Sequence, residues 1–95
     1  PLKVDLSRSA ADVVQQLAFR DKAKSRKLRK TLALLEQDPR HPGLNSHRYS
    51  DYDSLYNQKV WESYVENRTP GAYRVFWHYG PDPGEITIVA ITSHP

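Results

Sequence analysis

Hydrophobic and polar residues alternate most regularly in the last third of the chain. Segments 59–67, 72–80 and 85–93 are rich in aromatic and β-branched residues, and clusters of Pro, Gly and Asp separate them. Short runs of this kind between turn residues are typical of β-strands joined in sequence order. The last third therefore predicts an antiparallel meander of three strands.

Side chains of a strand point to opposite faces in turn, so the middle strand has two different sides. Arg74, Phe76 and His78 share one side, and a second set shares the other: Tyr73, Val75, Trp77 and Tyr79. The aromatic side predicts the core, with Trp61 and Trp77 as core residues, and the side with Arg74 predicts a working surface. In the last strand Ile86, Ile88 and Ala90 alternate with Thr87, Val89 and Ile91. Both of its faces are thus largely apolar, which favours the interior of a sheet.

The first third of the chain predicts one strand and two helices. Residues 2–6 alternate apolar and polar positions, as a half-buried strand does. A helical stripe of apolar residues follows from Ala10 to Ala18, after Ser7 or Ser9 as a possible N-cap. Asp21 is a good N-cap for a second helix, which the spacing of Leu28, Thr31, Leu32 and Leu35 extends to Glu36. The two helices are expected to form a hairpin.

The segment between the second helix and the meander is polar and carries Tyr49, Tyr52 and Tyr56. It predicts a long loop. The order of elements is then β-α-α-β-β-β, with the first strand beside the last one. We therefore expect one α+β domain over residues 1–95, in which a helical hairpin packs on a four-stranded, mostly antiparallel sheet.

Charge is distributed unevenly along the chain. Seven of the fourteen basic residues lie between positions 20 and 30, and the remaining chain carries seven basic and ten acidic residues. A basic helix on an acidic body predicts a polyanion or an acidic protein as partner. The alternative is a solvated helix face whose long side chains cover apolar surface.

Several classes of protein are disfavoured by what the sequence lacks. There is no cysteine, hence no disulfide or thiolate metal site. His41 and His47 fall in the predicted loop without a carboxylate or cysteine at ligand spacing, so we expect no metal and no cofactor. No apolar run is long enough for a membrane span and no secretory leader is recognisable, which makes a cytoplasmic protein the expectation.

The order of elements, the helix ending in LALLEQDPR, and the hairpin VWESYVENRTPGAYRVFWHYG followed by EITIVAI resemble the RelE/ParE superfamily of bacterial type II toxins. The resemblance covers nearly the whole chain. It implies the β-α-α-β-β-β fold and an antitoxin protein as partner. RelE-like members cleave messenger RNA on the ribosome without a metal ion, whereas ParE-like members act on DNA gyrase.

The resemblance also implies three catalytic residues. Arg74 matches the strand arginine that contacts the reacting phosphate in the nucleases. His94 lies near the end of the last strand, where nuclease members place a catalytic side chain. Glu62 and Tyr64 fall on the strand that carries lysines or a glutamate in the family. Arg74, Glu62 and His94 are therefore the candidate catalytic residues.

Metal-free cleavage of RNA needs a base, an acid and positive charge near the phosphate. Arg74 suits the phosphate because its guanidinium stays charged and grips two oxygens at once. Glu62, His78 or His94 could be the acid or the base, since histidine titrates near neutral pH. Aromatic faces could stack on an unpaired base. The candidate RNA-binding residues are Tyr64, Phe76, His78, Arg68, Lys27 and Lys30.

Other interpretations remain open at this point. Arg74 beside Glu62 or Glu66 could be a cross-strand ion pair, and His78 could be an exposed sheet residue. The second strand has no lysine pair, which favours a ParE-like or degenerate member that inhibits a protein target. A third possibility is an interaction module whose basic helices bind an acidic amphipathic peptide.

Overall fold

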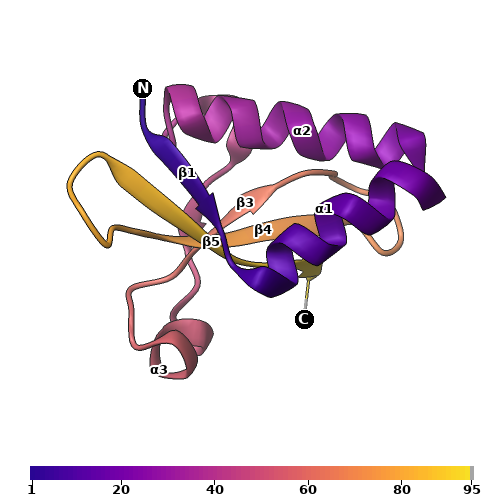
Figure 1. Ribbon diagram of the computed structural model, residues 1–95. Helices are drawn as coiled ribbons and strands as arrows, with labels where there is room; N and C mark the ends of the chain where they lie inside the picture. Colours follow the sequence, from indigo (N-terminus) through magenta and orange to yellow (C-terminus); the bar gives the residue numbers. More distant parts are fainter. Residues whose placement is uncertain (95) are drawn as a thin grey trace.

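A twisted five-stranded sheet runs through the middle of the molecule in the computed structural model, which describes residues 1–94 (Figure 1). The strands are β1 (Lys3–Leu6), β2 (His47–Arg48), β3 (Trp61–Tyr64), β4 (Tyr73–Tyr79) and β5 (Glu85–Ser93). Their order is β1-β5-β4-β3-β2, in which β1 is parallel to β5 and the other pairs are antiparallel. The expected α+β class and the place of the first strand beside the last are confirmed. The sheet has a fifth strand, however, because two residues of the predicted loop, His47 and Arg48, pair with β3.

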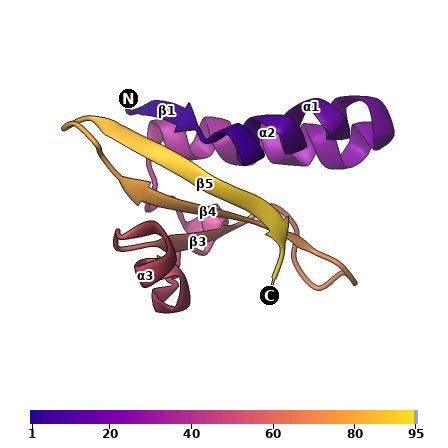
Figure 2. The ribbon, with the colours of Figure 1, turned by 60° about the horizontal axis from the view of Figure 1, so that its bottom comes forward.

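The predicted helical hairpin is present as α1 (Arg8–Arg20) and α2 (Lys22–Gln37). Ser7 is the N-cap of α1, since its Oγ accepts a hydrogen bond from the amide of Ala10. Ser9 lies within the helix. Asp21 caps α2 as expected and accepts a hydrogen bond from the amide of Lys24 at 3.0 Å. Both helices lie on the same side of the sheet (Figure 2), which we call the helix side.

The main core lies between the hairpin and the helix side of the sheet. Trp77 is 1% exposed, and its Nε1 donates a hydrogen bond to Ser63 Oγ at 2.8 Å. Trp61 stacks on Trp77 with ring centroids 5.8 Å apart, so the expectation that both are packed residues holds. The buried residues of this core are Ala10, Leu17, Leu28, Leu35, Leu44, Val75, Trp77, Ile86, Ile88 and Ile91.

A second, smaller core lies on the opposite side of the sheet, the far side. The segment predicted as a loop folds into the short helices η1 (Pro42–Leu44), η2 (Ser50–Tyr52) and α3 (Asp53–Tyr56). Figure 2 shows α3 on the side of the sheet away from α1 and α2. Tyr49, Tyr52 and Tyr56 pack there against the buried side chains of Val60, Phe76 and Val89. The tyrosines therefore help to fix this segment on the sheet.

A β-bulge interrupts the pairing of β4 with β5. Phe76 is opposite Ala90 and Trp77 is opposite Ile88, so Val89 is an extra residue on β5. Ile86 and Ile88 lie in the core of the helix side, and beyond the bulge Ile91 lies there too. Ala90 and Val89 contribute to the far side instead. The strict alternation predicted for this strand is therefore wrong from Val89 onward, because a bulge shifts every later side chain by one position.

Candidate functional site

Glu62 is the centre of a polar cluster on the far side of the sheet. It lies on β3 opposite Phe76 and is only 1% exposed. His47 Nε2 lies 2.7 Å from Glu62 Oε1, and His94 Nδ1 lies 2.5 Å from Glu62 Oε2. The two imidazole side chains are 47% and 52% exposed. A buried carboxylate is thus held between two histidines that reach solvent.

Arg74 approaches the same carboxylate from β4. Its Nε lies 3.7 Å from Glu62 Oε2, and its guanidinium carbon lies 3.7 Å from the centroid of the Tyr64 ring. One terminal nitrogen donates hydrogen bonds to the carbonyl oxygens of Glu66, at 2.5 Å, and Tyr73, at 3.2 Å. A cation held against an aromatic face and by carbonyl groups keeps its orientation. Arg74 is therefore a fixed positive charge beside Glu62.

Glu66, the other carboxylate that could pair with Arg74, is bound elsewhere. Its oxygens lie 3.1 Å from Lys24 Nζ and 3.5 Å from Lys27 Nζ. Burial acts on the pKa of Glu66 most strongly and raises it. The hydrogen bond from the Tyr73 amide and the charges of the two lysines lower it, so that the pKa is below its ordinary value. Part of the basic helix is therefore neutralised within the molecule.

Tyrosines border the cluster on the side of η2. The rings of Tyr49 and His94 meet edge to face with centroids 5.8 Å apart, and Tyr49 also packs on Phe76. Burial raises the pKa of the Tyr49 hydroxyl, and the charges of Asp51 and Glu62 raise it further. Tyr49 is accordingly a neutral phenol at the edge of the site.

The structure brings four of the residues singled out in the sequence into one cluster: Glu62, Tyr64, Arg74 and His94. Lys27 and Lys30 are separate from this cluster but line a hollow of about 340 Å³ between α2 and the β3–β4 connection, with Tyr64 as a shared wall. Arg68 lies in that connection and is exposed.

Two of the expected RNA-binding residues do not fit that role. Phe76 is 0% exposed beneath Tyr49 and Tyr52, so its ring offers no face to a base. His78 is only 9% exposed, and its Nδ1 lies 2.9 Å from the carbonyl oxygen of Tyr79. It also lies four positions along the strand from Arg74, about 13 Å at the usual rise. His78 is thus neither an exposed sheet residue nor part of the cluster.

His47 belongs to the cluster but was expected in a loop. It occupies the first position of β2, directly opposite Glu62 in the antiparallel pairing. A strand of two residues has no measurable periodicity, so alternation could not reveal it. The nearest signal in the sequence is the spacing of His47 and Tyr49, which would share a face in an extended segment.

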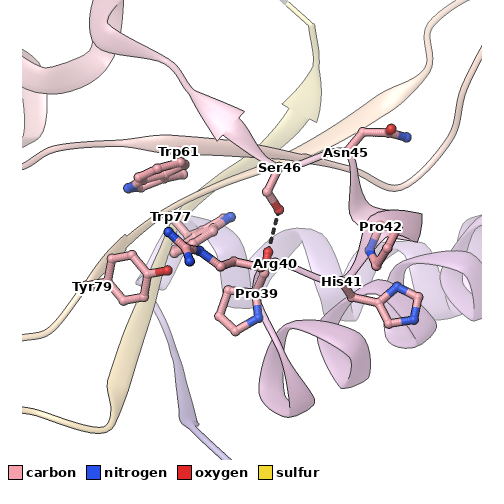
Figure 3. Close-up of a pocket in the computed structure, with 9 residues that line it drawn as sticks. All are labelled: Pro39, Arg40, His41, Pro42, Asn45, Ser46, Trp61, Trp77 and Tyr79. Carbon is pink, nitrogen blue, oxygen red and sulfur yellow. Dashed lines mark hydrogen bonds between the residues drawn. The ribbon is translucent and has the colours of Figure 1, made fainter.

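A separate hollow of about 320 Å³ lies at the other end of the sheet and is drawn in Figure 3. Trp61, Trp77 and Tyr79 line one side of it, and the segment after α2, including Arg40, lines the other. The hydroxyl of Ser46 donates to the carbonyl oxygen of Pro39 there, at 2.7 Å (Figure 3). Glu62 does not line this hollow, so the hollow is distinct from the polar cluster.

Two further observations concern ions and membranes. Within residues 1–94, no group of three His, Asp or Glu side chains is placed to hold a metal ion. In the same part of the chain, no helix combines the length and the apolar character needed to cross a membrane.

The sequence and the structure differ in what they match among known proteins. No protein-family model matches the sequence, and a comparison with curated protein sequences finds no match. The structure does match solved structures over almost its whole length. A YoeB/ParE toxin from Agrobacterium tumefaciens superposes with a TM-score of 0.76 at 9% identity, covering 99% of this chain and 100% of that one.

Two related matches come from Staphylococcus aureus. Its YoeB dimer gives a TM-score of 0.73 at 14% identity, with 99% of this chain and 98% of the other covered. Its YoeB–YefM complex gives 0.70 at 13% identity, with 100% and 99% covered. Identities this low establish the arrangement of the backbone and leave the activity to be argued from the site. This chain therefore has the fold of these YoeB and YoeB/ParE toxins.

Proposed function

We propose that this protein is a RelE-like toxin of a type II toxin–antitoxin system, which cleaves messenger RNA on the ribosome without a metal ion. The observation that supports this most directly is the pairing of His94 with the buried Glu62 beside the fixed guanidinium of Arg74. An acid–base pair next to an immobilised cation is what phosphate-ester cleavage requires.

Each of the three residues has a step in the proposed reaction. The proton-transfer pair takes the proton of a ribose 2′-hydroxyl, whose oxygen attacks the adjacent phosphorus. The bond from phosphorus to the 5′-oxygen of the next nucleotide breaks, and the pair returns a proton to that oxygen. Arg74 stabilises the negative charge that develops on the phosphate oxygens. Glu62 and His94 are the proton-transfer pair. The side chain of His94 is 52% exposed, and Glu62, at 1%, lies behind it.

The surface around the cluster suits a nucleic acid in part. Tyr64 adjoins both Arg74 and the hollow lined by Lys27 and Lys30, and Glu66, which also lines that hollow, offsets part of their positive charge. Arg68 adds a positive charge on the β3–β4 connection. These residues would contact phosphates of RNA rather than read bases.

An antitoxin is the proposed protein partner. The solved YoeB–YefM complex from Staphylococcus aureus shares this fold, which supports such a partnership here. An acidic antitoxin segment would complement the basic α2. Both the toxin and its target would then act in the cytoplasm.

The test compares inducible expression of the wild type with Arg74→Ala, while growth and the 5′ ends of messenger RNA are followed. We expect growth arrest with new cuts in translated RNA, and loss of both in Arg74→Ala. Removal of an electrostatic donor of this kind typically costs about 10²–10³ in rate. Arg8→Ala, an exposed arginine at the start of α1, is the matched control and should behave as the wild type.

Two results would contradict the proposal in different ways. Growth arrest with intact RNA would favour the ParE-like alternative, in which DNA gyrase or another protein is the target. Absence of arrest from folded protein would leave only an interaction module. Cuts that persist in Arg74→Ala would remove Arg74 from the site.

A further inference from the structure

His47 is in contact through both nitrogens of its ring. Nδ1 lies 2.9 Å from the carbonyl oxygen of Asn45, and Nε2 lies 2.7 Å from Glu62 Oε1. A carbonyl oxygen only accepts hydrogen bonds, so Nδ1 must carry a hydrogen. In a neutral ring Nε2 would then turn a lone pair toward a carboxylate oxygen. A second proton therefore lies between Nε2 and Oε1.

The surroundings indicate which atom holds that proton. Glu62 Oε2 faces His94 Nδ1 at 2.5 Å and Arg74 Nε at 3.7 Å, and both favour an ionised carboxylate. Arg74 Nε is buried without a hydrogen-bond partner. A neutral Glu62 would leave the guanidinium of Arg74, whose side chain is 12% exposed, without its counter-charge, which is costly. The His47 ring, by contrast, is half exposed and its charge can be solvated.

We propose that His47 is a positioning residue, an imidazolium that keeps Glu62 ionised and fixed so that Glu62 orients His94. Glu62 then accepts the Nδ1 hydrogen of His94, which leaves His94 Nε2 with its lone pair toward the substrate. The same use of a buried carboxylate to fix a histidine tautomer is known in hydrolases. The part of this inference that concerns cleavage rests on the proposed function, but the charge of His47 does not.

This arrangement changes how the proton-transfer pair works. Both oxygens of Glu62 are occupied by imidazole nitrogens, and the side chain is 1% exposed. The carboxylate therefore does not touch the ribose hydroxyl. His94 is the group that meets RNA, and His47 acts only through Glu62. Two tyrosines complete the titratable surroundings, Tyr64 beside His47 and Tyr49 beside His94.

The first measurement is the protonation of His47 in the wild type, by ¹⁵N–¹H NMR of the imidazole rings at pH 7. We expect both nitrogens of His47 to carry hydrogen. In Glu62→Gln the amide can donate to Nε2, so His47 should become neutral with hydrogen on Nδ1 alone. His41, an exposed histidine of the same segment, should give the same signals in both proteins. A bare ring nitrogen on His47 in the wild type would overturn the proposal.

The second measurement is the rate of RNA cleavage. His47→Leu removes the contact with Oε1, whereas His47→Gln keeps a donor there without the charge. We expect kcat to fall roughly tenfold in His47→Leu, which is part of the 10²–10⁴ that acid–base catalysis contributes, with KM little changed. His47→Gln should recover part of the rate, and His41→Gln should match the wild type.

The two measurements separate this inference from the proposed function. Unchanged kcat in folded His47→Leu would exclude a positioning role. If the wild type itself leaves RNA intact, the proposed function fails, while the NMR signals still decide whether His47 is charged. If His47→Leu does not fold, the NMR comparison on the wild type remains decisive.

Discussion

At the scale of single residues, polar side chains on the helix side of the sheet form one continuous chain of hydrogen bonds. On the helix side, Trp77 Nε1 donates to Ser63 Oγ, which lies 2.7 Å from Ser46 Oγ. Ser46 in turn donates to the carbonyl oxygen of Pro39. Because Ser46 uses its hydrogen there, the hydrogen of Ser63 must point to Ser46. The buried Trp77 and Ser63 thus both have partners, as the cost of an unpaired polar group demands.

Ser63→Ala tests this chain of hydrogen bonds. The substitution leaves the indole nitrogen of the buried Trp77 without an acceptor, so we expect the free energy of unfolding to fall by about 1–3 kcal/mol. Urea denaturation followed by tryptophan fluorescence measures it. Ser54→Ala, on the exposed surface of α3, should change stability little. Equal stability of Ser63→Ala and the wild type would mean that Trp77 finds another acceptor.

At the scale of elements, the stability of the helical hairpin depends on its tight junction. α1 ends at Arg20 and α2 begins at Lys22, so Asp21 alone joins them. Its amide bonds to the carbonyl oxygen of Leu17, and its carboxylate caps α2. One residue therefore satisfies groups at the end of one helix and at the start of the next.

Asp21→Ala should lower the free energy of unfolding by about 1 kcal/mol, since it removes the acceptor for the Lys24 amide. Asp12→Ala removes the same charge from an exposed position inside α1 and is the matched control. Thermal unfolding followed by circular dichroism compares them. A larger loss in Asp12→Ala would show that net charge, and not the cap, determines the effect.

Elements with a long periodic pattern were predictable, and those fixed by tertiary contacts were not. Leu28, Thr31 and Leu35 recur at helical spacing and are buried in α2 as expected. β2 and α3 are too short for any periodicity. They exist because Tyr49 and its neighbours pack on Phe76 and because Asp53 accepts a hydrogen bond from the Val60 amide and pairs with Arg48.

Only part of the candidate site was predictable from the sequence, because only some of its residues lie on elements with a periodic pattern. Arg74 lies on a strand with clear alternation, which placed it on the same side as Phe76, and Glu62 was singled out through the family resemblance. His47 depends on β2 and was missed. The burial of Phe76 follows from the tyrosines of the supposed loop, which no local pattern places above it.

At the scale of the whole molecule, the sheet separates two packed layers of unequal size. The helix side holds the larger core, and η2 and α3 cover part of the far side (Figure 2). The Glu62 cluster lies where that cover ends. The basic α2 is joined to the β3–β4 connection by Glu66, through Lys24 and Lys27.

The ion pairs of Glu66 with these two lysines make the free energy of unfolding depend on pH. The pKa of Glu66 is lowered in the folded state, so its contribution is full above its ordinary value of 4.5 and is lost as the pH falls through the lower, folded value. We expect the difference in unfolding free energy between wild type and Glu66→Gln to shrink as the pH falls below about 4.5. Urea denaturation at several pH values measures it.

Glu36→Gln, which removes an exposed carboxylate from the end of α2, is the control and should show a smaller dependence. A difference that stays constant from neutral to acidic pH would show that Glu66 acts through packing rather than through its charge.

Because of the bulge at Val89, the loss of a residue from β5 would affect the contact between His94 and Glu62. With regular alternation after Ile88, His94 would lie on the same side as Ile86, among the helices. The extra residue moves each later side chain of β5 to the opposite face of the sheet, so His94 contacts Glu62 instead. The number of residues in β5, more than their identity, thus decides whether the histidine reaches the carboxylate. Deletion of one residue of β5 there would separate His94 from Glu62, although both residues would still be in the sequence.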